Sequence, residues 1–287
     1  MAEPLRLGTR GSQLAWAQSG QVAAALTAAT GVQVERVRIT TRGDRFQDQP
    51  LPDIGGKGLF TAELEEALRS GAIDLAVHSL KDLPTEDPDG VVLGAIPERA
   101  DPRDALVGPA LDALPEGAVV GTGSLRRRMQ LLAHRPDLQI QDIRGNVPTR
   151  LKKRDEGQCV ATVLAMAGLI RLGIEREDIW PLPVELMIPA VGQGALGVQC
   201  RAGDARVLGL LAAVEDPDTR RCVEVERAFL AAVSGGCNSP AACYAVLEGD
   251  GLSAVACLEL ADGSLRRGSA RGVDAVALGR GLAAALR

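Results

Sequence analysis

Four side chains capable of chemistry follow directly after an alternating apolar segment in the first third of the chain. Residues 73–77 place an apolar side chain at every second position, which predicts a β-strand. The polar residues that come next are His78, Ser79, Lys81 and Asp82. In open α/β sheets, ligands bind at the carboxyl ends of strands, so these side chains are candidates for anion binding and proton transfer. A solvated loop without function is the alternative.

Two further segments combine a strand, a turn rich in glycine and serine, and a helix. The first runs from Leu7 to Ser12 and contains Arg10; the second runs from Val119 to Ser124 and leads into Arg126 and Arg127. The backbone N–H groups at the start of such a helix are unpaired and favour an anion. The two segments therefore predict matching anion sites, one in each lobe of a two-lobed protein.

A third glycine-rich segment, 55–58, carries Lys57 before a helix expected at 59–69 with Thr61 as its N-cap. It lacks the GxxxxGK[ST] spacing of a nucleotide-binding loop, because Gly58 and Leu59 follow the lysine. A nucleotide site is therefore not predicted.

Composition excludes several other classes of protein. The 287 residues are 46% hydrophobic and 24% charged, with a net charge of -5 and only 2% aromatic residues, so a nucleic-acid partner is not expected. The chain starts without an apolar leader and has no run of roughly 18 apolar residues, which predicts a cytoplasmic protein without membrane contact. The six cysteines form no CxxC pair and there are two histidines, so free thiols and no metal site are expected.

Strands and helices alternate along most of the chain, which predicts an α/β fold with mostly parallel sheets. Residues 97–104 are polar and interrupted twice by proline, and they are expected to connect two lobes. The strand at 195–199 is expected to return to the first lobe. The predicted division is residues 1–98 with 195–215 as the first lobe, 99–194 as the second, and 216–287 as a small α+β domain of hairpins and helices.

Seven ordered motifs resemble those of the porphobilinogen deaminase (hydroxymethylbilane synthase) family. They begin at Leu7 (LGTRGSQLA), Gly55 (GGKGLF), His78 (HSLKDLP), Gly121 (GTGSLRR), Ile143 (IRGNVPTR), Pro189 (PAVGQGA) and Gly235 (GGC). The resemblance covers essentially the whole chain. It implies two lobes like those of type II periplasmic binding proteins, followed by the α+β domain that bears Cys237.

The resemblance implies a transferase of tetrapyrrole biosynthesis that acts as a monomer. Such enzymes join four porphobilinogen molecules head to tail, with release of ammonia, on a dipyrromethane cofactor held by a cysteine thioether. Each ring carries two carboxylates, which guanidinium groups bind well. The implied cofactor-binding residues are Cys237, Ser79, Lys81, Ser124, Arg126, Arg127, Arg144 and Arg150. The implied substrate-binding residues are Arg10, Ser12, Lys57, Phe60 and Arg171.

The resemblance implies that Asp82 is the catalytic carboxylate. Loss of ammonia leaves a cationic azafulvene, and a carboxylate beside the pyrrole N–H would stabilise that charge. Without the resemblance, Asp82 could equally be a turn former before Pro84, and Cys237 a small buried hydrophobic residue. The chain departs from the family pattern at Trp16, where Leu is usual, at Val160, often Asp, and at Asn238–Ser239, commonly Gln-Val. The C-terminal domain is also shorter than in some relatives.

Two other functions fit part of the sequence. A clamshell binding module would account for the two lobes but needs neither the third domain nor its Gly-Gly-Cys motif. A phosphate-handling transferase would account for the arginines but lacks the nucleotide motif and the metal ligands.

Overall fold

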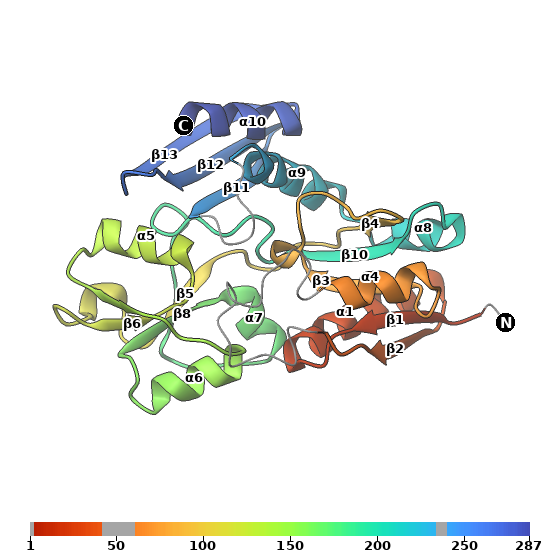
Figure 1. Ribbon diagram of the computed structural model, residues 1–287, viewed down its shortest axis with the longest axis horizontal. Helices are drawn as coiled ribbons and strands as arrows, with labels where there is room; N and C mark the ends of the chain where they lie inside the picture. Colours follow the sequence, from red (N-terminus) through yellow and green to blue (C-terminus); the bar gives the residue numbers. More distant parts are fainter. Residues whose placement is uncertain (1–2, 42–60, 234–239) are drawn as a thin grey trace. The chain divides into compact units, whose positions relative to one another are not determined.

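The computed structural model describes residues 3–41, 61–233 and 240–287 (Figure 1). Its contacts divide the chain into two compact units. The first unit contains residues 1–99 and 195–220, and the second contains residues 100–194 and 221–287. Each unit is described by itself below.

The first unit contains a five-stranded sheet with the order β2-β1-β3-β10-β4. Its strands are β1 (Leu5–Thr9), β2 (Val34–Arg38), β3 (Leu75–Ser79), β4 (Val91–Ala95) and β10 (Leu196–Arg201). Strands β2, β1 and β3 pair in parallel, whereas β10 is antiparallel to both β3 and β4. Four strands therefore run in one direction, and the fourth strand in the order runs in the other.

Helices cover both faces of this sheet. Helix α1 (Gln13–Thr30) and helix α8 (Ala205–Leu211) pack on the face that includes Leu75 and Val77. Helix α4 (Ala62–Arg69) packs on the face that includes Ala76. The alternation along β3 thus divides its side chains between two apolar layers. Two short 3-10 turns complete the unit, η1 (Leu80–Asp82) and η3 (Ala212–Val214).

The second unit repeats this topology with different parts of the chain. Its sheet has the order β7-β6-β8-β5-β9, and again the fourth strand in the order is reversed. The strands are β5 (Asp104–Val107), β6 (Val119–Gly121), β7 (Gln139–Gln141), β8 (Ala161–Ala165) and β9 (Ile179–Pro181). The helices are η2 (Leu111–Ala113), α5 (Leu125–His134), α6 (Val147–Asp155) and α7 (Met166–Arg171).

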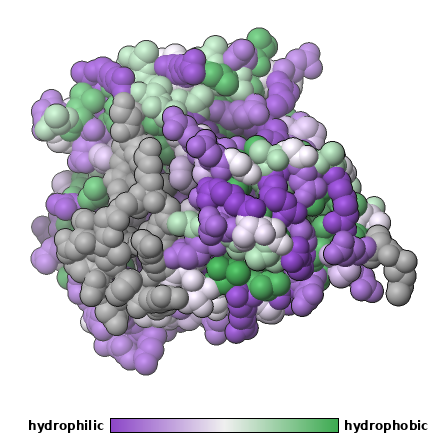
Figure 2. Space-filling view, turned by 45° about the vertical axis from the view of Figure 1, so that its right-hand side comes forward, coloured by the Kyte–Doolittle hydropathy of each residue, from purple (hydrophilic) through white to green (hydrophobic). Residues whose placement is uncertain are grey.

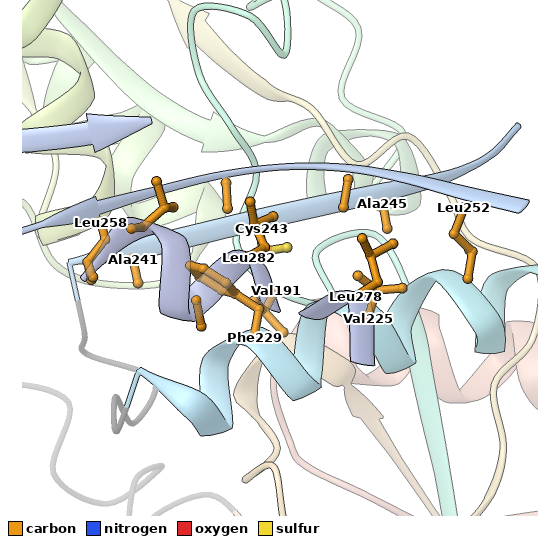
Figure 3. Close-up of a cluster of buried hydrophobic side chains, with 14 of the residues drawn as sticks. Val191, Val225, Phe229, Ala241, Cys243, Ala245, Leu252, Leu258, Leu278 and Leu282 are labelled. Carbon is orange, nitrogen blue, oxygen red and sulfur yellow. The ribbon is translucent and has the colours of Figure 1, made fainter. Parts of the chain in front are cut away.

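A three-stranded antiparallel sheet follows in the second unit. It is formed by β11 (Ala241–Glu248), β12 (Gly251–Glu259) and β13 (Leu265–Gly272), with helices α9 (Pro217–Ala232) and α10 (Ala275–Leu286). Figure 3 shows side chains of both helices and of the strands meeting in one core around the fully buried Phe229. Gly279 lets the helices touch, since a Cβ atom there would lie 2.3 Å from the carbonyl oxygen of Val225.

The predicted class, α/β with two mostly parallel sheets and a small α+β domain, is confirmed. The structure adds β5, β9 and α8, which the sequence patterns did not predict. Strand β5 begins at Asp104, inside the segment expected to be a connection. Thr61 is the N-cap residue of α4, as expected, but its side chain makes no capping hydrogen bond.

The surface mixes hydrophobic and hydrophilic residues, as expected for a chain with 46% hydrophobic and 24% charged residues. On the face shown in Figure 2, hydrophobic residues occur in small groups between hydrophilic ones. Among the described helices, none is both long and apolar enough to cross a membrane.

Candidate active site

In the first unit, the turn after β3 is anchored by two leucines. Leu80 and Leu83 are buried. A Cβ atom at Gly197, on the neighbouring strand, would lie 2.9 Å from a methyl group of Leu80 and 3.0 Å from one of Leu83. The missing side chain at Gly197 therefore leaves the space that these leucines fill. Asp82 is exposed at the end of η1, and the described residues provide it with no hydrogen bond or ion pair. A fixed turn thus presents a carboxylate to solvent.

The residues around this turn hold its start in place. The Oγ of Ser79 accepts a hydrogen bond of 2.7 Å from Nε2 of Gln18, a buried residue of α1. The backbone N–H of Leu80 donates to the carbonyl oxygen of Ala195 at 3.1 Å. Lys81 is half-buried beside Asp82. The predicted residues Ser79, Lys81 and Asp82 therefore do come together in one short turn.

His78, in contrast, points into the protein. It is 6% exposed, and its Nε2 atom has no hydrogen-bond partner among the described residues. The pKa of His78 is lowered from 6.5 to about 4, mainly by burial and also by the charge of Arg10, while a hydrogen bond with Gln199 opposes the shift. The imidazole is therefore neutral at pH 7.

The turn between β1 and α1 has the predicted order of strand, turn and helix. The Oγ of Ser12 accepts a hydrogen bond from the N–H of Ala15 at 3.2 Å and caps the helix. The hydroxyl of Thr9 donates to the carbonyl oxygen of Ala15 at 3.0 Å, which holds the turn from the strand side. Arg10 lies half-buried between them.

In the second unit, Ser124 caps α5 by accepting a hydrogen bond from the N–H of Arg127 at 3.4 Å. The two arginines that follow are buried, at 6% exposure for Arg126 and 5% for Arg127. Both contact Asp104, which is fully buried. One oxygen of Asp104 lies 2.7 Å from Nη1 of Arg126, and the other lies 2.7 Å from Nη2 of Arg127.

The charges of this cluster do not cancel. Burial alone would raise the pKa of Asp104, but the two guanidinium groups hold it well below its ordinary value, so the carboxylate is ionised. Burial lowers the pKa of Arg127, with a further decrease from Arg126 and an opposing increase from Asp104. Arginine nevertheless stays protonated in proteins. Two buried positive charges therefore share one negative charge.

A second layer of side chains supports the arginines. Nε2 of Gln193, from the predicted PAVGQGA motif, donates to Asp104 at 3.0 Å and to the carbonyl oxygen of Pro102 at 2.8 Å. The buried side chain of Gln130 makes two hydrogen bonds to the backbone of Ile188, whose carbonyl oxygen also accepts from Arg126. Arg267 of β13 donates to Gln130 at 3.1 Å.

The junction between β7 and α6 carries the next two predicted arginines. Asn146 caps the helix by accepting from the N–H of Thr149 at 2.9 Å. Arg144 contacts Asp142 at 2.9 Å and is 40% exposed, so this pair is a weak one at the surface. Nε of Arg150 donates to the carbonyl oxygen of Gly145, a residue with a φ of 114° that favours glycine.

Arg171 ends α7, and its Nη2 atom donates to the carbonyl oxygen of Gly194 at 2.8 Å. Burial lowers the pKa of Arg171 to about 10. The remaining predicted residues Lys57, Phe60 and Cys237 lie outside the described residues. Within the described part of the chain, no group of His, Cys, Asp and Glu side chains could hold a metal ion.

Sequence reasoning missed Asp104, Gln130 and Gln193 as parts of the site. Asp104 stands at the start of the apolar run Ala105–Val107, a pattern that also fits a short buried strand. An acidic residue at the start of such a strand, in a chain rich in arginine, could have indicated that Asp104 is buried with an arginine partner. Nothing in the sequence identified its arginine partners, more than twenty positions away.

Comparison with known proteins covers nearly the whole chain. A family model described as "Porphobilinogen deaminase, dipyromethane cofactor binding domain" matches residues 5–209, and one described as "Porphobilinogen deaminase, C-terminal domain" matches residues 220–287. A porphobilinogen deaminase of Roseiflexus castenholzii is 52% identical over 99% of this chain and 95% of its own length. One of Paracoccus denitrificans is 49% identical over 99% of this chain and 94% of its own.

Among solved structures, a periplasmic substrate-binding protein of an ABC transporter from Coxiella burnetii aligns over 75% of this chain and 94% of its own. The TM-score is 0.45 and the sequence identity is 16%.

The buried neutral His78 predicts a specific pH dependence of stability. Its pKa falls from 6.5 to about 4 on folding, so the unfolded chain binds the proton more tightly. The contribution of His78 to the free energy of unfolding is complete above pH 6.5 and is lost as the pH falls toward 4, by an amount on the order of 3 kcal/mol. Urea unfolding at intervals from pH 7 to pH 5 measures this slope.

The chain provides a matched control, since its second histidine, His134, is exposed. We expect His78→Gln to flatten the dependence of the unfolding free energy on pH, and His134→Gln to leave it as in the parent. Equal slopes in the parent and in His78→Gln would contradict a neutral buried imidazole.

Proposed function

This chain belongs to the porphobilinogen deaminase family, and from that premise we propose which of its residues bind the dipyrromethane cofactor, bind porphobilinogen and catalyse the release of ammonia. The activity and the cofactor are those of the family. The assignments to individual residues are supported by the geometry of the two strand–turn–helix segments and of the turn after β3.

The observation that carries the cofactor site is the unbalanced charge at the start of α5. Arg126 and Arg127 are buried with Asp104 as their only carboxylate partner among the described residues. A buried excess positive charge is unfavourable unless an anion compensates it. The cofactor carries carboxylates, so its chemistry fits the donors that are present. In this proposal, Ser79, Lys81, Ser124, Arg144 and Arg150 provide the further contacts, and Cys237 forms the thioether.

When bound, the dipyrromethane supplies the pyrrole carbon to which the first substrate unit is joined. The side chains named above would hold the carboxylates of the cofactor and so orient its rings. Arginine suits this task because its planar fork can bind both oxygens of a carboxylate at once. Since each added ring carries two carboxylates, the proposed substrate residues Arg10, Ser12, Lys57, Phe60 and Arg171 would bind the incoming unit.

Asp82 is the proposed catalytic residue. It is the carboxylate that the turn after β3 presents, and the described residues leave both of its oxygens without a partner. An ionised carboxylate can stabilise the cation that porphobilinogen becomes when ammonia leaves, and it can carry the pyrrole proton afterwards. The buried Leu80 and Leu83 hold the turn, so the carboxylate needs little rearrangement to reach this position.

Two broader properties stay predictions from the sequence. We propose that the enzyme is a monomer and that it acts in the cytoplasm. Size-exclusion chromatography with light scattering tests the monomeric state.

The catalytic proposal predicts a large effect of Asp82→Asn. The amide keeps the shape of the side chain but removes the negative charge, so we expect kcat to fall by about 100-fold or more, which corresponds to about 2.7 kcal/mol. Steady-state release of ammonia measures this, with thermal unfolding as the test of folding. Glu86→Gln, an exposed neighbour four residues along, is the control and should keep its activity. Near-normal turnover of Asp82→Asn would contradict the catalytic role and leave Asp82 with a structural role in the turn.

The cofactor proposal predicts a covalent adduct on one cysteine. Protein purified from cells that make porphobilinogen should have an intact mass above that of the sequence by two linked pyrroles, with the adduct on the peptide containing Cys237. Cys237→Ser should lack the adduct and be inactive, whereas Cys222→Ser and Cys243→Ser should carry it. An unmodified Cys237 in the active parent protein would contradict the proposal.

A thiol reagent provides an independent check on the same protein. The other five cysteines are all buried, and burial raises the pKa of both Cys200 and Cys257 to about 11. They should react slowly in the folded protein, because the thiolate is the reactive form. We expect one fast-reacting thiol in protein made without porphobilinogen, and none in the loaded protein.

A further inference from the structure

The two buried arginines of α5 differ in how many of their donors are occupied. Nε and Nη2 of Arg127 both donate to Asp104, at 3.0 and 2.7 Å, and its Nη1 donates to the carbonyl oxygen of Val163 at 2.7 Å. Every nitrogen of that guanidinium group therefore has a partner. Arg126 uses only Nη1, which donates to Asp104 and to the carbonyl oxygen of Ile188, each at 2.7 Å.

The other two nitrogens of Arg126, Nε and Nη2, have no hydrogen-bond partner among the described residues. They carry three N–H donors on a side chain that is 6% exposed. Neither nitrogen is among the fully enclosed side-chain atoms that lack a partner, so both reach the surface and are open to an acceptor. Because Nε–H and one Nη2–H point in the same direction, they match the two oxygens of a carboxylate.

Asp104 is held in a rigid position between these groups. It begins β5, which lies between β8 and β9 in the sheet, and its backbone carbonyl accepts from the N–H of Leu182 at 2.8 Å. Its carboxylate accepts hydrogen bonds from Arg126, Arg127 and Gln193. The strand holds the backbone of Asp104 and these three side chains hold its carboxylate, so the oxygens that receive the guanidinium groups have a fixed position.

We propose that Asp104 is a positioning residue that gives the two arginines different roles. It saturates Arg127, which becomes a fixed support, and it holds Arg126 by one nitrogen, so that Arg126 presents its remaining fork to a carboxylate of the dipyrromethane. The inference rests on the function proposed above and adds a residue outside the motifs that define the family resemblance.

The proposal depends on the length of the Asp104 side chain as well as on its charge. Asp104→Glu keeps the charge of the cluster but displaces the carboxylate by one methylene, so both guanidinium groups must shift. Asp101→Glu is the matched control, because it makes the same change three positions before Asp104. Among the described residues, the carboxylate of Asp101 contacts the partly exposed Arg103 and not the buried arginines.

The experiment follows adduct formation on full-length protein made in cells that lack porphobilinogen. Each variant is incubated with increasing porphobilinogen, and the intact mass gives the fraction of chains that carry the two-pyrrole adduct. For Asp104→Glu we expect the half-saturating concentration to rise at least tenfold while the final loaded fraction stays near that of the parent. Asp101→Glu should match the parent in both quantities.

Other results would overturn the proposal. If Asp104→Glu has the same half-saturating concentration as the parent, the position of the Asp104 carboxylate does not matter. If only its loaded fraction is lower, Asp104 has a role in stability alone. If the parent itself forms no adduct, the proposed function fails first and this inference falls with it.

A second pair of variants keeps the test decisive if Asp104→Glu does not fold. Arg126→Lys removes the fork that faces the carboxylate, whereas Arg127→Lys removes the support of Asp104. We expect Arg126→Lys to raise the half-saturating concentration more than Arg127→Lys does, and Arg127→Lys to lower the unfolding temperature more. A larger rise of the half-saturating concentration in Arg127→Lys, together with a larger fall of the unfolding temperature in Arg126→Lys, would contradict the assigned roles.

Discussion

The ion cluster of Asp104, Arg126 and Arg127 is the interaction on which the second unit most depends. Asp104 is fully buried and joins β5 to the start of α5, and through Gln193 it also holds the segment that leads out of the unit. Removing one member of a buried ion cluster leaves an uncompensated charge, which costs roughly 3–5 kcal/mol. The cluster therefore constrains the fold, and the proposed cofactor site uses the same guanidinium groups.

The two α/β sheets share one strand order, with the fourth strand reversed in each. In each, the second strand of the order leads into a serine-capped helix, through Ser12 in the first unit and Ser124 in the second. The third strand of the order differs between the units: β3 ends in η1, which carries the exposed carboxylate of Asp82, whereas β8 leads directly into α7. The second unit instead buries its arginines around Asp104. In the proposed function, catalysis and carboxylate binding therefore use equivalent edges of similar sheets.

Much of this arrangement could be predicted from the sequence, because it depends on local signals. Alternating apolar residues predicted β3, and a glycine- and serine-rich turn after a strand predicted the starts of α1 and α5. Gly31 ends α1 with a φ of 71°, a conformation that favours glycine. Family motifs then supplied the roles of residues that local patterns could not distinguish from turn formers.

The features that were missed depend on contacts between distant residues. Strand β5 is four residues long and follows a polar segment, so its burial is a consequence of β8 and β9 on either side. The burial of Arg126 and Arg127 requires Asp104, and no spacing rule connects these positions. Trp16, unusual for the family, is explained only by the guanidinium groups of Arg36 and Arg38, which lie 3.9 and 4.5 Å from the centre of its ring.

The central claim is that Arg126 receives the cofactor carboxylate while Arg127 is already saturated by Asp104. Nitrogen-15 NMR of the arginine side chains, recorded on the protein before and after cofactor loading, tests it most directly. Assignment by Arg126→Lys and Arg127→Lys identifies the two Nε–H signals. We predict a large change in the Nε–H signal of Arg126 on loading and little change in that of Arg127. An unchanged Arg126 signal, or a larger change at Arg127, would contradict the account.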